Sequence, residues 1–360
     1  MTKFLNFGLL SLTVLGLTAC PGAKSKDGGT TPVSSPITAA TPASTSLYAV
    51  SGTCYAGGVG TNAPSNTIVK YDGKSGVRLT TVADYRVVAP GDSPISISGL
   101  DSNDVLVTVQ NTNAQRIDRV HRDGSGGSSF LFNSAAFSTA LRNIFTTKDG
   151  SFLVTRAAAV ERFTSFRTRY LNGTSPYISN PTATACTGMA TALTFSLELS
   201  NGNILVGSGA ATPNNKIATF NPNGYGVAAD CLASKAAPTT TAIPTAAVNA
   251  GPTTVFVSYA SPAAADNMII AYQFSSSAMN LSTATATSVL NSPSLLFGVS
   301  AMAFDSTNNY LYVANSALGG ERIEKFSWDP TAGTLTRVGT TPFIQDPDLT
   351  CMSGLYLGEN

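Results

Sequence analysis

A short apolar strand recurs six times along the chain, and this repeat constrains the fold more than any other feature. Successive copies begin 47 to 58 residues apart, and a second short strand follows each copy. The six copies are Leu47–Val50, Val105–Val109, Phe152–Thr155, Ile204–Gly207, Val255–Ser258 and Tyr310–Val313. A steady period of this length indicates a fold built from repeated units.

The clearest unit is Val299–Pro342. It contains four short strand patterns joined by turn residues: Val299–Phe304, Tyr310–Ala314, Arg322–Trp328 and Leu335–Gly339. Four antiparallel strands in roughly 45 residues are typical of one blade of a β-propeller. The repeat therefore predicts an all-β fold.

The two ends of the repeat region complement each other. No strand pattern precedes Leu47 within its unit, whereas Cys351–Leu357 resembles a first strand with nothing after it. We predict that this tail inserts as the inner strand of the first blade, because closing the ring leaves no open sheet edge. The prediction is a single six-bladed β-propeller over residues 47–360, with seven blades as the alternative.

The best-formed units carry a resemblance to known propellers. Phe304–Asn315 and Phe326–Thr336 resemble the repeat of the 6-phosphogluconolactonase family, and Lys216–Gly224 is similar to an NHL repeat. The resemblance implies the propeller scaffold, and it suggests a lactonase-like hydrolase as one possible activity. A scaffold repeat does not by itself specify chemistry.

The amino terminus reads as a targeting segment. Lys3 precedes the apolar run Phe4–Leu17, which is too short for a permanent membrane span, so residues 1–19 are predicted to be a signal peptide. The sequence Leu-Thr-Ala-Cys at 17–20 resembles the lipobox of bacterial lipoproteins, in which the cysteine, here Cys20, is acylated. An ordinary secretory cleavage site is the alternative.

The segment 20–46 is rich in Pro, Thr, Ser, Ala and Gly and lacks an apolar period. We interpret it as a flexible tether with a mean reach of roughly 28 Å. The tether and the acylated cysteine predict an exported bacterial lipoprotein that is anchored to a membrane. The absence of Asp after Cys20 favours the outer membrane over the inner membrane.

Four cysteines follow Cys20, and an oxidising compartment favours disulfides between them. The four allow three pairings. Antiparallel pairing of the tail with the first strand brings Cys54 and Cys351 together, and Cys186 and Cys231 both belong to the fourth unit. We therefore expect the bridges Cys54–Cys351 and Cys186–Cys231, with free buried thiols as the alternative.

Positive charge is concentrated between residues 116 and 169, where nine Lys or Arg stand against four acids. Two of these arginines, Arg142 and Arg156, are placed by the blade template near the channel at the face that carries the longer loops. Arginine matches carboxylate or phosphate groups in a bidentate way, so the pair is a candidate anion site. Solvated strand faces with ordinary salt bridges are the alternative.

Three acids in loops between blades are candidate ligands of a divalent cation. Asp92, Asp346 and Asp348 occupy loops where lactonase-like propellers hold a metal, and hard cations prefer several oxygen ligands. The alternative is that they cap turns. The chain has one histidine, which excludes a zinc site made of several imidazoles. No cofactor is required by any motif, and no catalytic residue is predicted.

The favoured function is a membrane-tethered, non-enzymatic binding module of the cell envelope. Its looped face is expected to contact a protein or glycan, and a net charge of +1 gives no general attraction to nucleic acid. The alternative is a metal-dependent, lactonase-like hydrolase. Whether the protein is an enzyme stays open at this point.

The lipoprotein prediction has a direct test in cell fractionation. Changing Cys20 to Ala removes the acceptor of the acyl chains, so the variant should leave the membrane fraction. A variant that still sediments with membranes after a high-salt wash would contradict the prediction.

Overall fold

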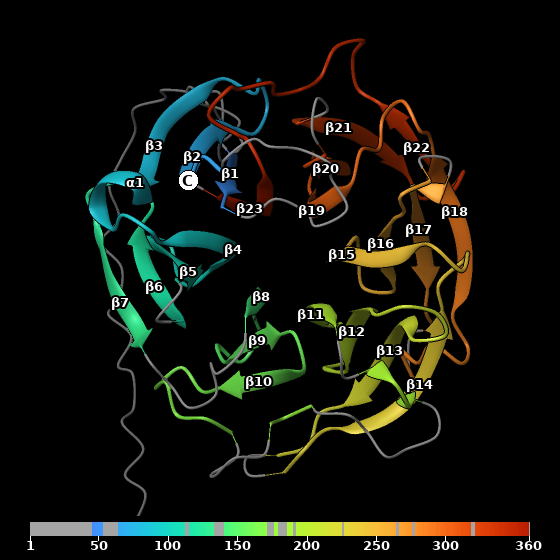
Figure 1. The fold of residues 1–360 in the computed structure, drawn as a ribbon. Coiled ribbons are helices and arrows are strands. Elements are labelled where there is room, and N and C mark those ends of the chain that lie inside the picture. The colour runs from blue at the N-terminus through green and yellow to red at the C-terminus, as the bar shows by residue number, and fades with distance from the viewer. Residues whose placement is uncertain are drawn as a thin grey trace, which may run out of the picture. The chain divides into compact units, whose positions relative to one another are not determined.

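The computed structural model describes residues 45–52, 64–111, 115–132, 140–170, 176–178, 186–189, 192–224, 227–263, 266–275, 278–317 and 321–359. Residues 43–360 form one compact unit. Within it, six antiparallel sheets surround a central channel like the blades of a propeller (Figure 1). The predicted fold, with six blades, is confirmed. No helix among the described residues is long and apolar enough to cross a membrane.

Five blades have four strands and blade three has three, each described from the channel outwards. Blade one contains β23 (Met352–Glu359), β1 (Thr45–Ser51), β2 (Thr67–Asp72) and β3 (Arg78–Asp84). Blade two contains β4 (Ser93–Gly99), β5 (Asp104–Gln110), β6 (Gln115–His121) and β7 (Gly127–Phe132). Blade three contains β8 (Leu141–Thr146), β9 (Phe152–Arg156) and β10 (Ala159–Phe163).

The second half of the ring repeats this order. Blade four contains β11 (Leu193–Glu198), β12 (Ile204–Gly209), β13 (Asn215–Asn221) and β14 (Asp230–Ala236). Blade five contains β15 (Ile243–Asn249), β16 (Thr254–Ala260), β17 (Met268–Gln273) and β18 (Thr285–Asn291). Blade six contains β19 (Val299–Asp305), β20 (Tyr310–Asn315), β21 (Arg322–Asp329) and β22 (Thr334–Arg337). The helix α1 (Tyr85–Val88) connects blades one and two.

The tail closes the ring in the predicted way. Strand β23 pairs with β1 in antiparallel register, with Leu47 opposite Leu357 and Ala49 opposite Leu355. The first blade therefore combines its inner strand from the end of the chain with three strands from its beginning. This pairing covers the edge of β1 that would otherwise face the channel without a partner.

The hydrophobic core consists of six clusters, one between each pair of neighbouring blades. Alternation along a strand produces this arrangement, because successive side chains point to opposite faces of a sheet. In β1, Leu47 and Ala49 pack toward blade six, whereas Tyr48 and Val50 pack toward blade two. Each blade is thus buried on both faces, and its strands read as short apolar runs.

The closure can be tested by truncation. A chain that ends at Cys351 keeps all its cysteines but lacks β23, so it exposes the edge of β1 and half of two core clusters. We expect aggregation or rapid cleavage in limited proteolysis, whereas a control that lacks only Glu359 and Asn360 should resist the protease like the parent. A soluble, protease-resistant protein without β23 would show that the ring does not depend on the tail.

Candidate functional site: the central channel

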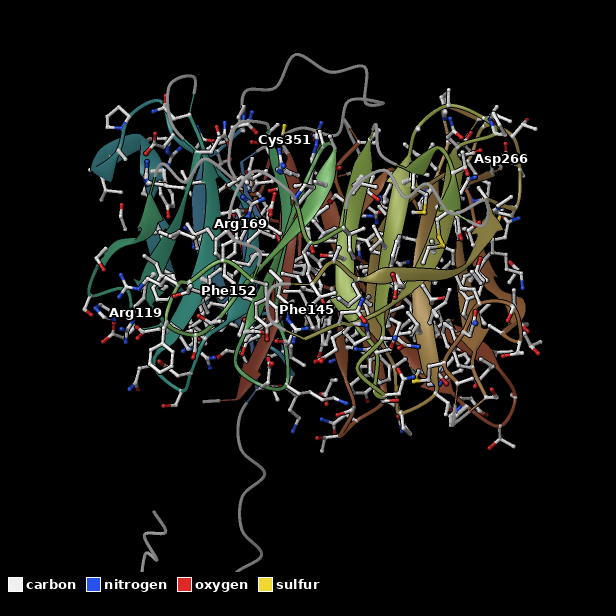
Figure 2. All side chains as sticks on the ribbon, turned by 90° about the horizontal axis from the view of Figure 1, so that it is seen from below. Arg119, Phe145, Phe152, Arg169, Asp266 and Cys351 are labelled. Atoms are coloured by element: carbon white, nitrogen blue, oxygen red, sulfur yellow. A yellow bond between two sulfur atoms is a disulfide. The ribbon has the colours of Figure 1, made fainter. Side chains whose placement is uncertain are left out.

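The channel runs between two different faces of the propeller. The ends of second strands and the connections between blades lie at one face, which we call the looped face, and the opposite face is the plain face. In Figure 2, Cys351 and Asp266 lie at the looped face, whereas Arg119 and Phe145 lie toward the plain face. The six inner strands β23, β4, β8, β11, β15 and β19 line the channel between them (Figure 1).

Every inner strand carries a β-bulge at the same place, close to the looped face. In each blade one residue of the inner strand is passed over in the pairing with the second strand. The six bulged residues are Ser353, Ile95, Arg142, Thr194, Thr245 and Ser300. Bulges redirect side chains and are common beside functional sites. We call this set the bulge ring.

Five members of the bulge ring, all except Ile95, line a narrow cavity of about 70 Å³ that we call the throat. Hydroxyl and amide side chains from the same strands, Ser96, Asn143 and Ser196, complete its polar lining. Arg142 is the one charged residue among the described residues that line the throat. The Thr194 hydroxyl oxygen is buried and lacks a hydrogen-bond partner in the described part of the chain. The throat therefore offers donors to an anionic or polar group.

Arg142 differs from the other basic residues of the positive segment. The guanidinium of this exposed side chain has no ion pair or hydrogen bond with any residue that the structure describes. The remaining eight all have partners. Arg116, Arg119, Arg156, Arg162 and Arg169 contact acids, and Arg122, Lys148 and Arg167 donate to backbone carbonyls. Arg142 is thus the basic side chain most available to a ligand.

The second arginine of the expected anion site, Arg156, has a structural role instead. Its guanidinium lies 2.9 Å from Glu161, which also accepts from Arg169 at 2.6 Å. Glu161 is 0 % exposed. A buried carboxylate requires such compensation, because leaving its charge without partners costs far more than the ion pair gains. The expectation that Arg142 and Arg156 act together is therefore corrected.

The same arrangement occurs in two other blades. In blade six, Glu324 lies 2.6 Å from Arg322 and 2.8 Å from Arg337, and in blade two Asp118 lies 2.8 Å from Arg116. The three acids occupy equivalent positions on third strands. We call these groups the acid clamps, because each ties neighbouring strands of one blade together.

The three acids considered for a metal do not form one site. Asp92 is buried in contact with Arg116 at 2.5 Å and accepts from Asn111. Asp346 and Asp348 both contact Arg78, at 3.2 and 2.8 Å. No cluster of three or more His, Cys, Asp or Glu that could hold a metal exists among the described residues. The expectation that these carboxylates meet at the channel mouth is corrected.

Asp346 has a second partner that explains its position. The Tyr71 hydroxyl donates to it over 2.7 Å. Burial and this hydrogen bond raise the pKa of Tyr71 well above its usual value, so the phenol keeps its proton at neutral pH. The acid therefore fixes the connection from blade six to blade one against the third strand of blade one.

A wider cavity of about 810 Å³ forms the plain-face end of the channel. We call it the vestibule. Its lining is largely apolar and includes Phe145, Val248, Met302, Phe304 and Leu357, and its charged members among the described residues are Asp101 and Arg122. Throat and vestibule share six lining residues, so they are continuous. This part of the channel lies at the face where the sequence predicted no site.

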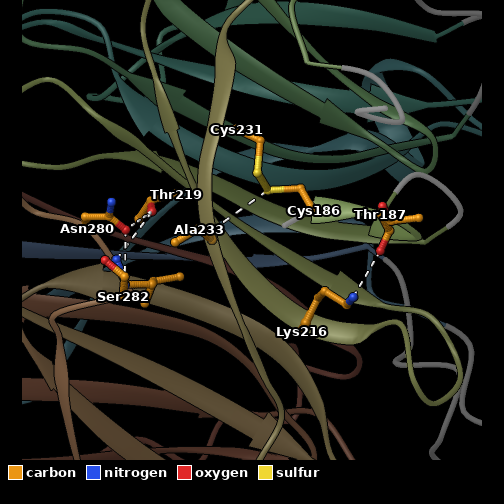
Figure 3. Close-up of a disulfide and its surroundings, with 9 residues drawn as sticks. Cys186, Thr187, Lys216, Thr219, Cys231, Ala233, Asn280 and Ser282 are labelled. Carbon is orange, nitrogen blue, oxygen red and sulfur yellow. Dashed lines mark hydrogen bonds between the residues drawn. A yellow bond between two sulfur atoms is a disulfide. The ribbon is translucent and has the colours of Figure 1, made fainter. Parts of the chain in front are cut away.

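One of the expected disulfides is present in the described residues. Cys186 and Cys231 are joined, with their Cα atoms 6.2 Å apart (Figure 3). Cys231 stands near the start of β14 rather than at the end of the outer strand, as the sequence had suggested. Cys351 also belongs to a disulfide. Its expected pairing with Cys54 stays a prediction, because Cys54 lies outside the described residues, as does Cys20.

Sequence reasoning placed Arg142 but missed the residues around it. The bulge ring has no signal in the sequence, because a bulge is a property of the pairing between two strands. The acid clamps did have one. An acid follows the apolar residue of the third strand in Arg-Ile-Asp-Arg-Val (116–120), Val-Glu-Arg-Phe (160–163) and Arg-Ile-Glu-Lys-Phe (322–326).

Comparison with known proteins supports the fold. No protein-family model and no curated protein matches the sequence. A proposed 6-phosphogluconolactonase from Bacteroides fragilis is 12% identical, with 89% of this chain and 99% of that chain covered and a TM-score of 0.53. For the periplasmic gluconolactonase of Pseudomonas aeruginosa the values are 12%, 86%, 99% and 0.52. For a chain of the nidogen/laminin complex they are 11%, 87%, 98% and 0.55. The chain is thus similar in fold to lactonase-like propellers.

The role of the acid clamps can be tested at Glu161. Changing it to Gln leaves two buried guanidinium groups without their carboxylate, so the free energy of unfolding should fall by roughly 3–5 kcal/mol. The control is Asp84→Asn, which breaks a surface pair with Arg86 and should cost about 0–1 kcal/mol. Urea denaturation followed by circular dichroism measures both. Equal losses in the two variants would show that the Glu161 cluster adds nothing to stability.

Proposed function

We propose that this protein is a membrane-tethered binding module of the cell envelope that recognises an anionic group in the throat of its channel. The single observation that carries the proposal is Arg142, which lines a ring of hydroxyl side chains without a partner among the described residues. A carboxylate or phosphate supplies both the charge and the acceptors that such a lining requires. The tether and the lipid anchor enter from the sequence alone.

Recognition rather than catalysis is supported by what the throat contains. Its described lining includes no carboxylate, imidazole, thiol or lysine. General acid–base and nucleophilic catalysis need such a group within hydrogen-bond reach of the reacting atoms. The buried, unpartnered hydroxyl of Thr194 favours a polar ligand, because a hydrogen bond from that ligand would remove a desolvation cost of about 1–3 kcal/mol.

A lactonase-like hydrolase is the second candidate. The observation that favours it is the fold shared with the two lactonase structures, at 12% identity. It can be separated from a binding module by measuring gluconolactone hydrolysis in a pH-stat. A rate above the uncatalysed one that disappears in Arg142→Gln would favour the hydrolase.

The binding site can be tested with the unit 43–360, which is compact by itself. Changing Arg142 to Gln should weaken the binding of acetate or phosphate at least about tenfold, equivalent to about 1.4 kcal/mol. Stability should change little, because an exposed charge contributes about 0–1 kcal/mol. Titration calorimetry at constant ionic strength measures the affinity.

The matched control is Arg86→Gln, which removes the same charge from a surface side chain paired with Asp84 on the outside of the ring. This variant should bind like the parent. Equal weakening in both variants would reveal a general effect of net charge, and unchanged binding in Arg142→Gln would refute the site.

A further inference from the structure

The vestibule has a chemistry that the anion site alone does not use. Its volume of about 810 Å³ lies within the usual range for small-molecule sites, which are mostly apolar with a few polar groups. Phe145, Val248, Phe304 and Leu357 line it and are only partly buried by the protein. Apolar surface in a concave, continuous cavity favours an apolar occupant over water.

The charged end and the apolar part of the channel are held at a fixed separation. Arg142 and Phe145 belong to the same strand, β8, so they stand about 10 Å apart along it. Arg142 lines the throat, and Phe145 lines both cavities. A single ligand that enters from the plain face can therefore contact both.

We propose that the ligand is an amphipathic anion, whose charged head binds Arg142 in the throat while its apolar body fills the vestibule. This inference rests on the proposed anion recognition and adds the chemical class of the ligand and its direction of entry. The ligand reaches the channel from the plain face and not from the looped face. A monocarboxylate with an unbranched alkyl chain is the simplest member of this class.

The test uses the unit 43–360 and straight-chain carboxylates from acetate to decanoate, below their micelle concentrations. Affinity should rise at least about twofold per added methylene, since full burial of a methylene corresponds to about fourfold. Arg142→Gln should weaken decanoate binding at least about tenfold and leave decanol binding unchanged. Ala247→Phe, which adds bulk where both cavities meet, should weaken both ligands about tenfold and leave acetate unchanged.

The control for added bulk is Val87→Phe on α1, where the side chain is exposed outside the channel. It should bind every probe like the parent, and circular dichroism verifies that each variant is folded. Acetate binding that depends on Arg142 without a gain along the series would overturn the amphipathic ligand and leave the anion site standing. Equal binding of decanol and decanoate, with no effect of Arg142→Gln, would overturn both proposals.

Discussion

The fold depends on one strand pairing, the ladder between β23 and β1. Each core cluster needs two neighbouring blades, so the six clusters exist together only when the ring is complete. Without β23 the first blade lacks Met352 and Leu355, which pack against blade six. The longest sequence separation in the fold therefore carries the contact on which burial of every other blade depends.

Crowding at the hub determines what the channel can contain. The inner strands approach so closely that a Cβ on Gly354 would lie 3.1 Å from the Cα of Ser96, and one on Gly99 would meet the Tyr356 hydroxyl. Small and hydroxyl side chains therefore dominate, and they join neighbouring blades by hydrogen bonds such as Ser98 to the amide of Thr146. The bulges interrupt this packing at one level, and a side chain as large as Arg142 is accommodated there.

The sequence predicted the fold well because each second and third strand has its own apolar run and turn, as in Val105–Val109 after Asp101-Ser-Asn. The tail strand followed from the same logic. The site was predicted less well, because it depends on side chains that meet across blades. Arg142 and Arg156 look alike in the sequence, yet only the structure shows that Glu161 engages one of them. The helix α1 and the vestibule also arise from tertiary placement.

The position of β1 has a mechanical consequence. The chain enters the propeller at Thr45, and from there β1 is hydrogen-bonded on both sides, with Ser46 opposite Asp72 on one flank and Gly358 on the other. Tension applied through the preceding residues along the strand loads two ladders in shear, so many hydrogen bonds must break together. Such a strand resists extraction far better than a terminal hairpin that unzips one pair at a time. The site of attachment is thus also the point at which the domain best withstands a pull.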